Sequence, residues 1–299
     1  MLLNLREYHR PAADGGHGGL TRALELLARP AIRTVALAGG DMLIGSGDPT
    51  IEAVVDLQGL EDLYGLDTDP NAGALQAGAM MTRAELVGAG LALAQGDHPG
   101  SPLQMVAEAA RRWGGNVQRN RATLGGALAA AVSNDPLIVV LLACDASVAF
   151  DTLAGSHRLP IAEFLADRVK ILAEPAVITE VNVPLPPAAP TGYALTEVGR
   201  TPADAPIVVA AAAVGRKDGR CAYARLALGG VAETPVRLPE VEALLEGQLL
   251  SPELLAQAAA RAAELVNPTG DFRGSAEYRK AMAGVLSERA LRQACERRA

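Results

Sequence analysis

The chain has 299 residues, 49% of them hydrophobic, and a formal net charge of −7 at pH 7. A single hydrophobic core stops growing at roughly 250–300 residues, so this length predicts two domains. The negative charge argues against nonspecific nucleic-acid binding, and the sequence has no apolar run of about 20 residues that would span a membrane.

Short apolar strands and helices alternate through the first part of the chain. Apolar residues at helical spacing predict a helix over Leu20–Ala28, and two apolar runs predict strands over Thr34–Ala38 and Ala53–Leu57. Asp56 closes the second strand, where its carboxylate is suited to cap the following turn. The next predicted elements are helices at Leu103–Arg112 and Pro136–Ala143, a strand at Ala146–Phe150, a helix from Pro160 and a strand at Ala176–Val183.

A proline-rich stretch, Pro184–Pro190, continues neither a helix nor a strand, because proline lacks a backbone N–H. We therefore predict a first domain over residues 1–186, with lobes of about 1–57 and 58–186, and a second domain over 187–299. The second domain has predicted strands at Gly192–Val198, Ile207–Arg216 and Cys221–Gly229, then helices at Pro239–Leu245, Pro252–Val266 and Ser275 to about Cys295. Lys217-Asp218-Gly219 is a hairpin signal between two of these strands. Strands followed by helices predict an α+β fold, with helices on one face of an antiparallel sheet.

Two double-glycine loops are the most informative motifs, Ala38-Gly39-Gly40-Asp41-Met42 and Thr123-Leu124-Gly125-Gly126-Ala127. Glycine lets backbone amides approach a bulky anion, and consecutive N–H groups can converge into a concave anion-binding site. Paired glycines also serve ordinary turns, so one loop alone is weak support. Two such loops, each after an apolar or helical run, fit a ligand with two phosphates.

Other cofactor and metal motifs are absent. Neither loop has the G-x-G-x-x-G spacing of the nicotinamide fold, no apolar strand precedes the Gly15–Gly19 run, and there is no P-loop ending. The three cysteines and four histidines show no metal-ligand spacing, so we expect the cysteines to be apolar filler. The N-terminal sequence acquires charge too early for a signal peptide, and we expect a cytoplasmic protein.

Four motifs occur together in a fixed order: Ala38-Gly39-Gly40, Val54–Leu57, Gly78–Thr82 and Arg119–Gly126. With them the chain resembles the FAD-binding (medium) subunit of the molybdenum hydroxylases, the group that contains carbon monoxide dehydrogenase and xanthine dehydrogenase. The resemblance starts near Tyr8 and extends through Leu228–Val231 and Asp271–Arg279. It implies a two-lobed FAD-binding domain of the vanillyl-alcohol-oxidase-like type, followed by the antiparallel sheet with its helices.

The resemblance implies electron transfer rather than substrate hydroxylation. A large partner subunit with the molybdenum cofactor would oxidise the substrate, and a small partner with two [2Fe–2S] clusters would pass electrons to FAD. NAD, a quinone or another acceptor would receive the electrons, and no side chain of this chain need be catalytic. Two alternatives stay open: a structural scaffold subunit that has lost FAD, and a self-sufficient flavoprotein oxidase. The oxidase is disfavoured because the sequence offers no clear acid–base pair for a substrate.

By resemblance, the FAD pyrophosphate would contact the first loop and the second one, with the Thr123 hydroxyl as an added donor. Trp113 lies where relatives can have an aromatic residue beside the flavin nucleotide, and Leu172 lies where a relative packs an apolar residue near the flavin. Asp135 matches, one residue early, an aspartate that contacts flavin in relatives. Packing is an equally good reading of Trp113 and Leu172. The complete candidate set is Ala38, Gly39, Gly40, Asp41, Met42, Leu43, Trp113, Thr123, Gly125, Gly126, Asp135 and Leu172.

Several positions depart from the family pattern. Relatives usually have a neutral polar residue and then Ser or Asp where this chain has Asp41 and Met42. A carboxylate about 4 Å from a phosphate costs roughly 1–4 kcal/mol, so Asp41 must point away, bind the ribityl hydroxyls or weaken the site. Ala127 replaces a polar residue, Asp135 comes one residue early, and Glu197 stands where a lysine is common.

Overall fold

The computed structural model describes residues 4–12, 18–69, 74–94, 101–184, 191–201 and 204–297. The chain forms two compact units, each assembled from three segments. The first unit comprises Met1–Arg83, Asn116–Ala130 and Ser147–Asn182, and the second comprises Ala84–Gly115, Ala131–Ala146 and Val183–Ala299. The domain boundaries at residues 57 and 186 stay predictions.

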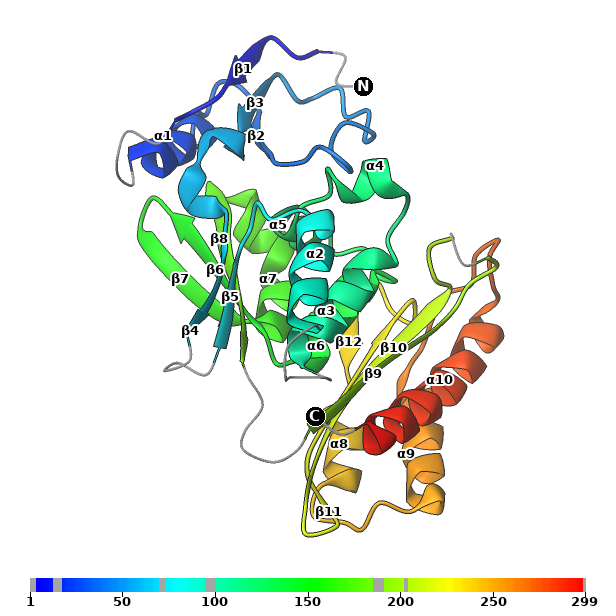
Figure 1. Cartoon of the computed structure of the whole chain (residues 1–299). Helices are drawn as coiled ribbons and strands as arrows, with labels where there is room; N and C mark the ends of the chain where they lie inside the picture. The colour runs from blue at the N-terminus through cyan, green and yellow to red at the C-terminus, as the bar shows by residue number, and fades with distance from the viewer. Residues whose placement is uncertain are drawn as a thin grey trace. The chain divides into compact units, whose positions relative to one another are not determined.

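A small parallel sheet opens the first unit, in the order β1 (Glu7–His9), β3 (Ala53–Asp56), β2 (Thr34–Leu37). Helix α1 (Gly18–Leu27) buries its apolar stripe against this sheet through Leu20, Ala23 and Leu24, which contact Val55 in one core. The predicted helix and both predicted strands are confirmed (Figure 1). Strand β1 was not predicted, because three residues are too few to show an alternation.

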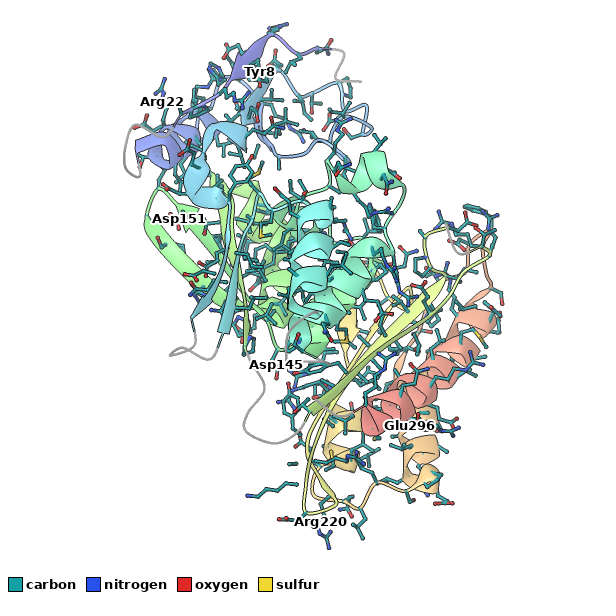
Figure 2. The ribbon with its side chains drawn as sticks, viewed as in Figure 1. Tyr8, Arg22, Asp145, Asp151, Arg220 and Glu296 are labelled. Carbon is teal, nitrogen blue, oxygen red and sulfur yellow. The ribbon has the colours of Figure 1, made fainter. Side chains whose placement is uncertain are left out.

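Asp56 ties this sheet together. Its carboxylate is 3% exposed and accepts a hydrogen bond from the Gln58 N–H at 2.9 Å, so the predicted cap is confirmed. It also accepts a hydrogen bond from the hydroxyl of Tyr8, which stands on β1 (Figure 2). That hydrogen bond is the main cause of the raised pKa of Tyr8.

A five-stranded sheet completes the first unit, in the order β4-β5-β8-β6-β7. Its strands are β4 (Leu66–Asp69), β5 (Ala74–Gly78), β8 (Ala176–Pro184), β6 (Ser147–Thr152) and β7 (Gly155–Pro160). Helix α7 (Ile161–Ala173) covers one face, where Phe150 and Phe164 pack with ring centroids 6.0 Å apart. Because side chains alternate along a strand, Asp151 lies on the opposite face. There it lines a polar hollow of about 420 Å³ together with Asp67, Arg158 and Glu180.

The second unit is built on an antiparallel sheet in the order β12-β11-β10-β9. Its strands are β9 (Thr191–Val198), β10 (Val208–Lys217), β11 (Arg220–Gly229) and β12 (Val236–Arg237). The predicted hairpin joins β10 to β11, with positive φ at Asp218 (52°) and Gly219 (77°), as its short turn requires. The helices α8 (Pro239–Leu245), α9 (Pro252–Leu265) and α10 (Ala276–Glu296) follow.

Helices cover both faces of this sheet. Ala210, Ala212 and Val214 of β10 share one core with α8, α9 and α10, which confirms the predicted helical face. The other face contacts α3 (Pro102–Arg111) and α6 (Pro136–Ala143), which come from the first half of the sequence (Figure 1). This second cover was not predicted. The other α-helices among the described residues are α2 (Arg83–Ala94), α4 (Asn116–Arg119) and α5 (Leu124–Ala130), and η1 (Leu57–Gly59) and η2 (Glu61–Leu63) are short 3-10 helices.

Helix α6 is buried at every position, yet it has only eight residues. Within the ranges that the structure describes, no helix combines the length and the apolar composition needed to cross a bilayer.

Candidate anion-binding site

The first glycine loop begins where β2 ends, at Leu37. Gly40 has φ of +72°, a conformation that favours glycine. Gly39 lies against the second motif segment: a Cβ on Gly39 would stand 1.4 Å from the carbonyl oxygen of Arg121. The first glycine is thus required by close approach and the second by backbone conformation.

The same loop presents free backbone donors. The N–H groups of Gly39, Gly40, Met42 and Leu43 donate to no acceptor within the described part of the chain. The loop closes instead through the N–H of Ile44, which donates to the Gly40 carbonyl at 3.3 Å. Adjacent unpaired amides of this kind are suited to an anion with several oxygens.

Arg121 follows α4 and brings a cation to this loop. Its Nε donates to the Gly39 carbonyl at 3.3 Å, and one Nη lies 3.3 Å from the position that a Cβ on Gly40 would take. The side chain is exposed. Sequence reasoning missed Arg121, although its place two residues before Thr123 was a usable signal.

The prediction of a loop at the second motif is wrong, because Leu124–Ala127 lie in helix α5 (Leu124–Ala130). The amides of this segment, for which we keep the name second glycine loop, are already paired. The N–H of Leu124 donates to Met81 at 2.8 Å and that of Gly125 donates to Ala79 at 2.7 Å. The N–H of Gly126 donates to the Thr123 hydroxyl at 3.1 Å, and Thr123 is 3% exposed. These hydrogen bonds therefore fix the first residues of α5 to the Gly78–Thr82 motif. Contact of Thr123, Gly125 and Gly126 with a ligand stays a prediction.

The other predicted site residues differ in their exposure and in the unit to which they belong. Ala38, Asp41 and Leu43 are half-buried, and Met42 is 49% exposed. Trp113 is half-buried just after α3, and Leu172 is half-buried on α7. Asp135 is 1% exposed and caps α6 by accepting from the Leu137 N–H at 3.0 Å. Trp113 and Asp135 belong to the second unit, the others to the first.

Glu197, the departure from the family lysine, has a clear partner. On β9 it forms an ion pair with Arg112 at 2.6 Å, and Arg112 also pairs with Glu108 of α3 at 2.6 Å. The three charges tie α3 to the antiparallel sheet, so the acidic residue has a structural role here.

The cysteines are packing residues rather than ligands or nucleophiles. Cys144 and Cys221 are buried, and Cys295 is partly buried. Burial raises the pKa of Cys144, and it raises that of Cys221 to about 11, so these thiols stay protonated at neutral pH. Among the described residues, no group of three His, Cys, Asp or Glu side chains is placed to hold a metal ion.

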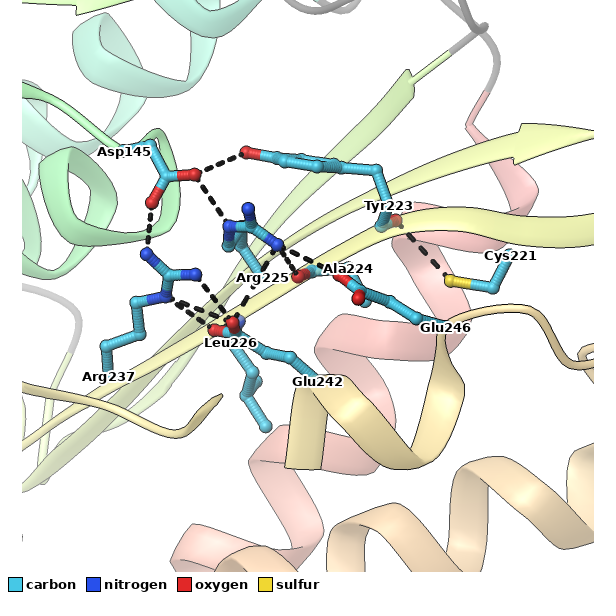
Figure 3. Close-up of polar contacts among 9 residues, drawn as sticks. All are labelled: Asp145, Cys221, Tyr223, Ala224, Arg225, Leu226, Arg237, Glu242 and Glu246. Carbon is cyan, nitrogen blue, oxygen red and sulfur yellow. Dashed lines mark hydrogen bonds and ion pairs between the residues drawn. The ribbon is translucent and has the colours of Figure 1, made fainter. Parts of the chain in front are cut away.

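A network of charges in the second unit joins the end of α6 to the sheet (Figure 3). Asp145 accepts hydrogen bonds from Tyr223, Arg225 and Arg237. Glu242, with a side chain 4% exposed, accepts from Arg237 at 2.7 and 2.8 Å and from the Leu226 N–H at 3.1 Å. Because acids and guanidinium groups pair directly, the network is a structural tie rather than an open site.

The C-terminal motif Asp271–Arg279 forms a tight turn before α10. Asp271 accepts from the N–H groups of Arg273 and Gly274 at 2.9 and 3.1 Å and from Arg279 at 2.8 Å. The buried Arg279 also donates to the carbonyls of Ile207 and Gly230, each at 2.8 Å. The motif thus fixes two loops of the second unit to α10.

These contacts predict a specific pH dependence. The Arg279 hydrogen bond above all holds the pKa of Asp271 below its ordinary value of 3.8. Because the folded pKa is lowered, the stabilisation is present above the unfolded pKa and is lost as pH falls through the folded value. Urea unfolding should show a lower free energy of unfolding for Asp271→Asn than for wild type at pH 7. The difference between the two free energies should become smaller below about pH 4. The same difference in free energy of unfolding at pH 7 and pH 3 would contradict this prediction. The control variant is Asp167→Asn, because Asp167 lies on the exposed side of α7.

Two family models match the chain in sequence order. The model described as "FAD binding domain in molybdopterin dehydrogenase" matches residues 20–186, more than half of the chain. The model described as "CO dehydrogenase flavoprotein C-terminal domain" matches residues 193–294.

Individual relatives match over nearly the full length. The 6-hydroxypseudooxynicotine dehydrogenase complex subunit alpha of Paenarthrobacter nicotinovorans is 32% identical over 92% of this chain and 91% of the relative. The carbon monoxide dehydrogenase medium chain of Afipia carboxidovorans is 28% identical over 98% of each chain. A solved structure of carbon monoxide dehydrogenase from Hydrogenophaga pseudoflava, lacking the Mo-pyranopterin moiety of its cofactor, contains a chain with a TM-score of 0.88, 28% identity and 100% coverage of both chains. The likeness therefore includes both compact units.

Proposed function

Because this chain belongs to the family of FAD-binding medium subunits of the molybdenum hydroxylases, we propose that it binds FAD and transfers electrons within a heteromeric complex. The observation that carries the proposal is the first glycine loop, whose unpaired amides fit a pyrophosphate group. The packing of this loop depends on its first glycine, since a Cβ on Gly39 would collide with the backbone of Arg121.

In this proposal the chain binds and orients the cofactor. When bound, FAD supplies the ability to take electrons singly and deliver them in pairs. The amides of Gly39, Gly40, Met42 and Leu43 would hold the pyrophosphate as hydrogen-bond donors. Trp113, Asp135 and Leu172 remain proposed contacts of the flavin part.

The partners and the acceptor are part of the same proposal. Relatives are described as a medium chain and as a complex subunit, which supports assembly with other chains. We assign to these partners the molybdenum cofactor, in a large subunit, and the [2Fe–2S] clusters, in a small subunit. NAD or a quinone is the proposed final acceptor, and the cytoplasmic location stays a prediction.

One specific observation favours a scaffold subunit instead. The first loop contains Asp41, and the amides of Leu124, Gly125 and Gly126 in the second loop are engaged within the chain. A subunit of this kind would retain the fold and its partners without carrying flavin.

The flavin content of the assembled complex separates these functions. The chain is co-expressed with its genomic neighbours, the complex is purified, and the flavin released on denaturation is identified by chromatography. We expect about one FAD per copy of this chain. Iron–sulfur absorption without flavin, in a complex that contains this chain, would establish the scaffold. Substrate-dependent flavin reduction by the isolated chain would establish the self-sufficient oxidase.

A further inference from the structure

The first glycine loop has a charge problem if it binds a pyrophosphate. Asp41 adds a carboxylate to the loop, and Met42 offers no side-chain hydroxyl to a phosphate. Like charges a few ångströms apart repel even near a protein surface, so a nearby cation would strengthen binding. Such a cation has to come from another segment, because Ala38–Leu43 contains none.

Arg121 meets this requirement. Its guanidinium lies beside Gly40, and its Nε donates to the Gly39 carbonyl. Within the described part of the chain, the Nη groups donate to no protein acceptor. No carboxylate lies within ion-pair distance of Arg121 among the described residues. Other exposed arginines of the first unit, such as Arg22 with Glu25 and Arg158 with Glu180, do have acidic partners.

We propose that Arg121 is a ligand of the FAD pyrophosphate and that its charge offsets that of Asp41. The Nη groups would donate to phosphate oxygens beside the loop amides, while Nε keeps the guanidinium in place. Arginine suits this role because its planar donors match phosphate geometry. The proposal rests on the proposed FAD function and adds a residue outside both glycine loops.

The test compares flavin affinities of the wild-type and Arg121→Gln complexes after flavin is stripped and titrated back. Loss of a charged hydrogen bond should raise the Kd for FAD about 10- to 100-fold. The Kd for riboflavin, which has no phosphate, should change less than twofold. Added salt should weaken FAD binding to the wild-type complex more than to the Arg121→Gln complex. Salt screens the attraction between the Arg121 guanidinium and the pyrophosphate, which only the wild type has. Arg121→Lys should recover part of the affinity.

Matched variants isolate the charge effect. Arg22→Gln, on the exposed face of α1 (Figure 2), should leave the Kd for FAD unchanged. Asp41→Asn should improve FAD binding more in the Arg121→Gln background than in wild type, as expected for two coupled charges.

Three results would overturn the proposal. An unchanged Kd for FAD in Arg121→Gln would leave the FAD function standing and remove Arg121 from the site. Equal weakening of FAD and riboflavin would show a loop-supporting role instead of phosphate contact. A wild-type complex that takes up no FAD would overturn both proposals, so the two failures are distinguishable.

Discussion

Gly39→Ala should release FAD from the complex and lower the free energy of unfolding by roughly 3 kcal/mol, the upper end of the usual cost of overpacking. The added Cβ would stand 1.4 Å from the carbonyl oxygen of Arg121 and 2.5 Å from its carbonyl carbon. Both are backbone atoms, so no side-chain rotation relieves the clash and the two segments must separate. That separation would also displace Arg121 from Gly40.

FAD content after gel filtration and urea unfolding measure the two effects. Gly88→Ala is the control, because Gly88 is exposed on α2 with open space at its Cβ position. Alanine also favours a helix over glycine by about 1 kcal/mol, so Gly88→Ala should retain FAD and unfold at equal or higher urea. Full FAD content and unchanged unfolding in Gly39→Ala would show that the loops are not packed as described.

Glu242→Ala should destabilise the second unit by about 2–3 kcal/mol, the upper part of the usual cost of leaving a buried hydrogen-bond donor unsatisfied. The Glu242 side chain is 4% exposed and receives hydrogen bonds from Arg237 and from the backbone of Leu226 (Figure 3). Its removal leaves the Arg237 guanidinium with Asp145 alone and the Leu226 N–H without its side-chain acceptor.

The single tryptophan, Trp113, lies in the second unit, so its fluorescence during urea unfolding reports on that unit. Glu240→Ala is the matched control on the same helix: Glu240 pairs with Arg261, but its side chain is 64% exposed, so we expect a loss of no more than about 1 kcal/mol. Similar losses of unfolding free energy in Glu242→Ala and Glu240→Ala would show that the buried Glu242 carboxylate contributes no more than an exposed one.

The helices and strands with strong local patterns could be predicted from the sequence, but several long-range contacts could not. Pro136–Ala143 was found as a helix, yet its uniformly apolar residues give no periodicity that indicates which face packs where. The structure surrounds it on all sides. Likewise, β8 lies between β5 and β6 in the sheet, an order that no turn signal encodes.

The candidate site, too, could be predicted from the sequence only in its local features. The first loop was predicted from its glycines, and Gly40 does have the positive φ that such a loop uses. Arg121 was missed because its contact with Gly39 joins residues 82 positions apart. The pairing of the Leu124 and Gly125 amides could not be predicted, because their acceptors are the carbonyls of Met81 and Ala79 in a distant part of the sequence.

The double cover of the antiparallel sheet has a consequence for biosynthesis. During translation α3 and α6 leave the ribosome before any strand of the sheet on which they pack, so the nascent chain carries the wholly apolar α6 without the strands that cover it. Transiently exposed apolar surface of this kind promotes aggregation and recruits chaperones. A ribosome stalled within the β9–β10 region would hold this state, whereas a released chain that includes β11 can bury it.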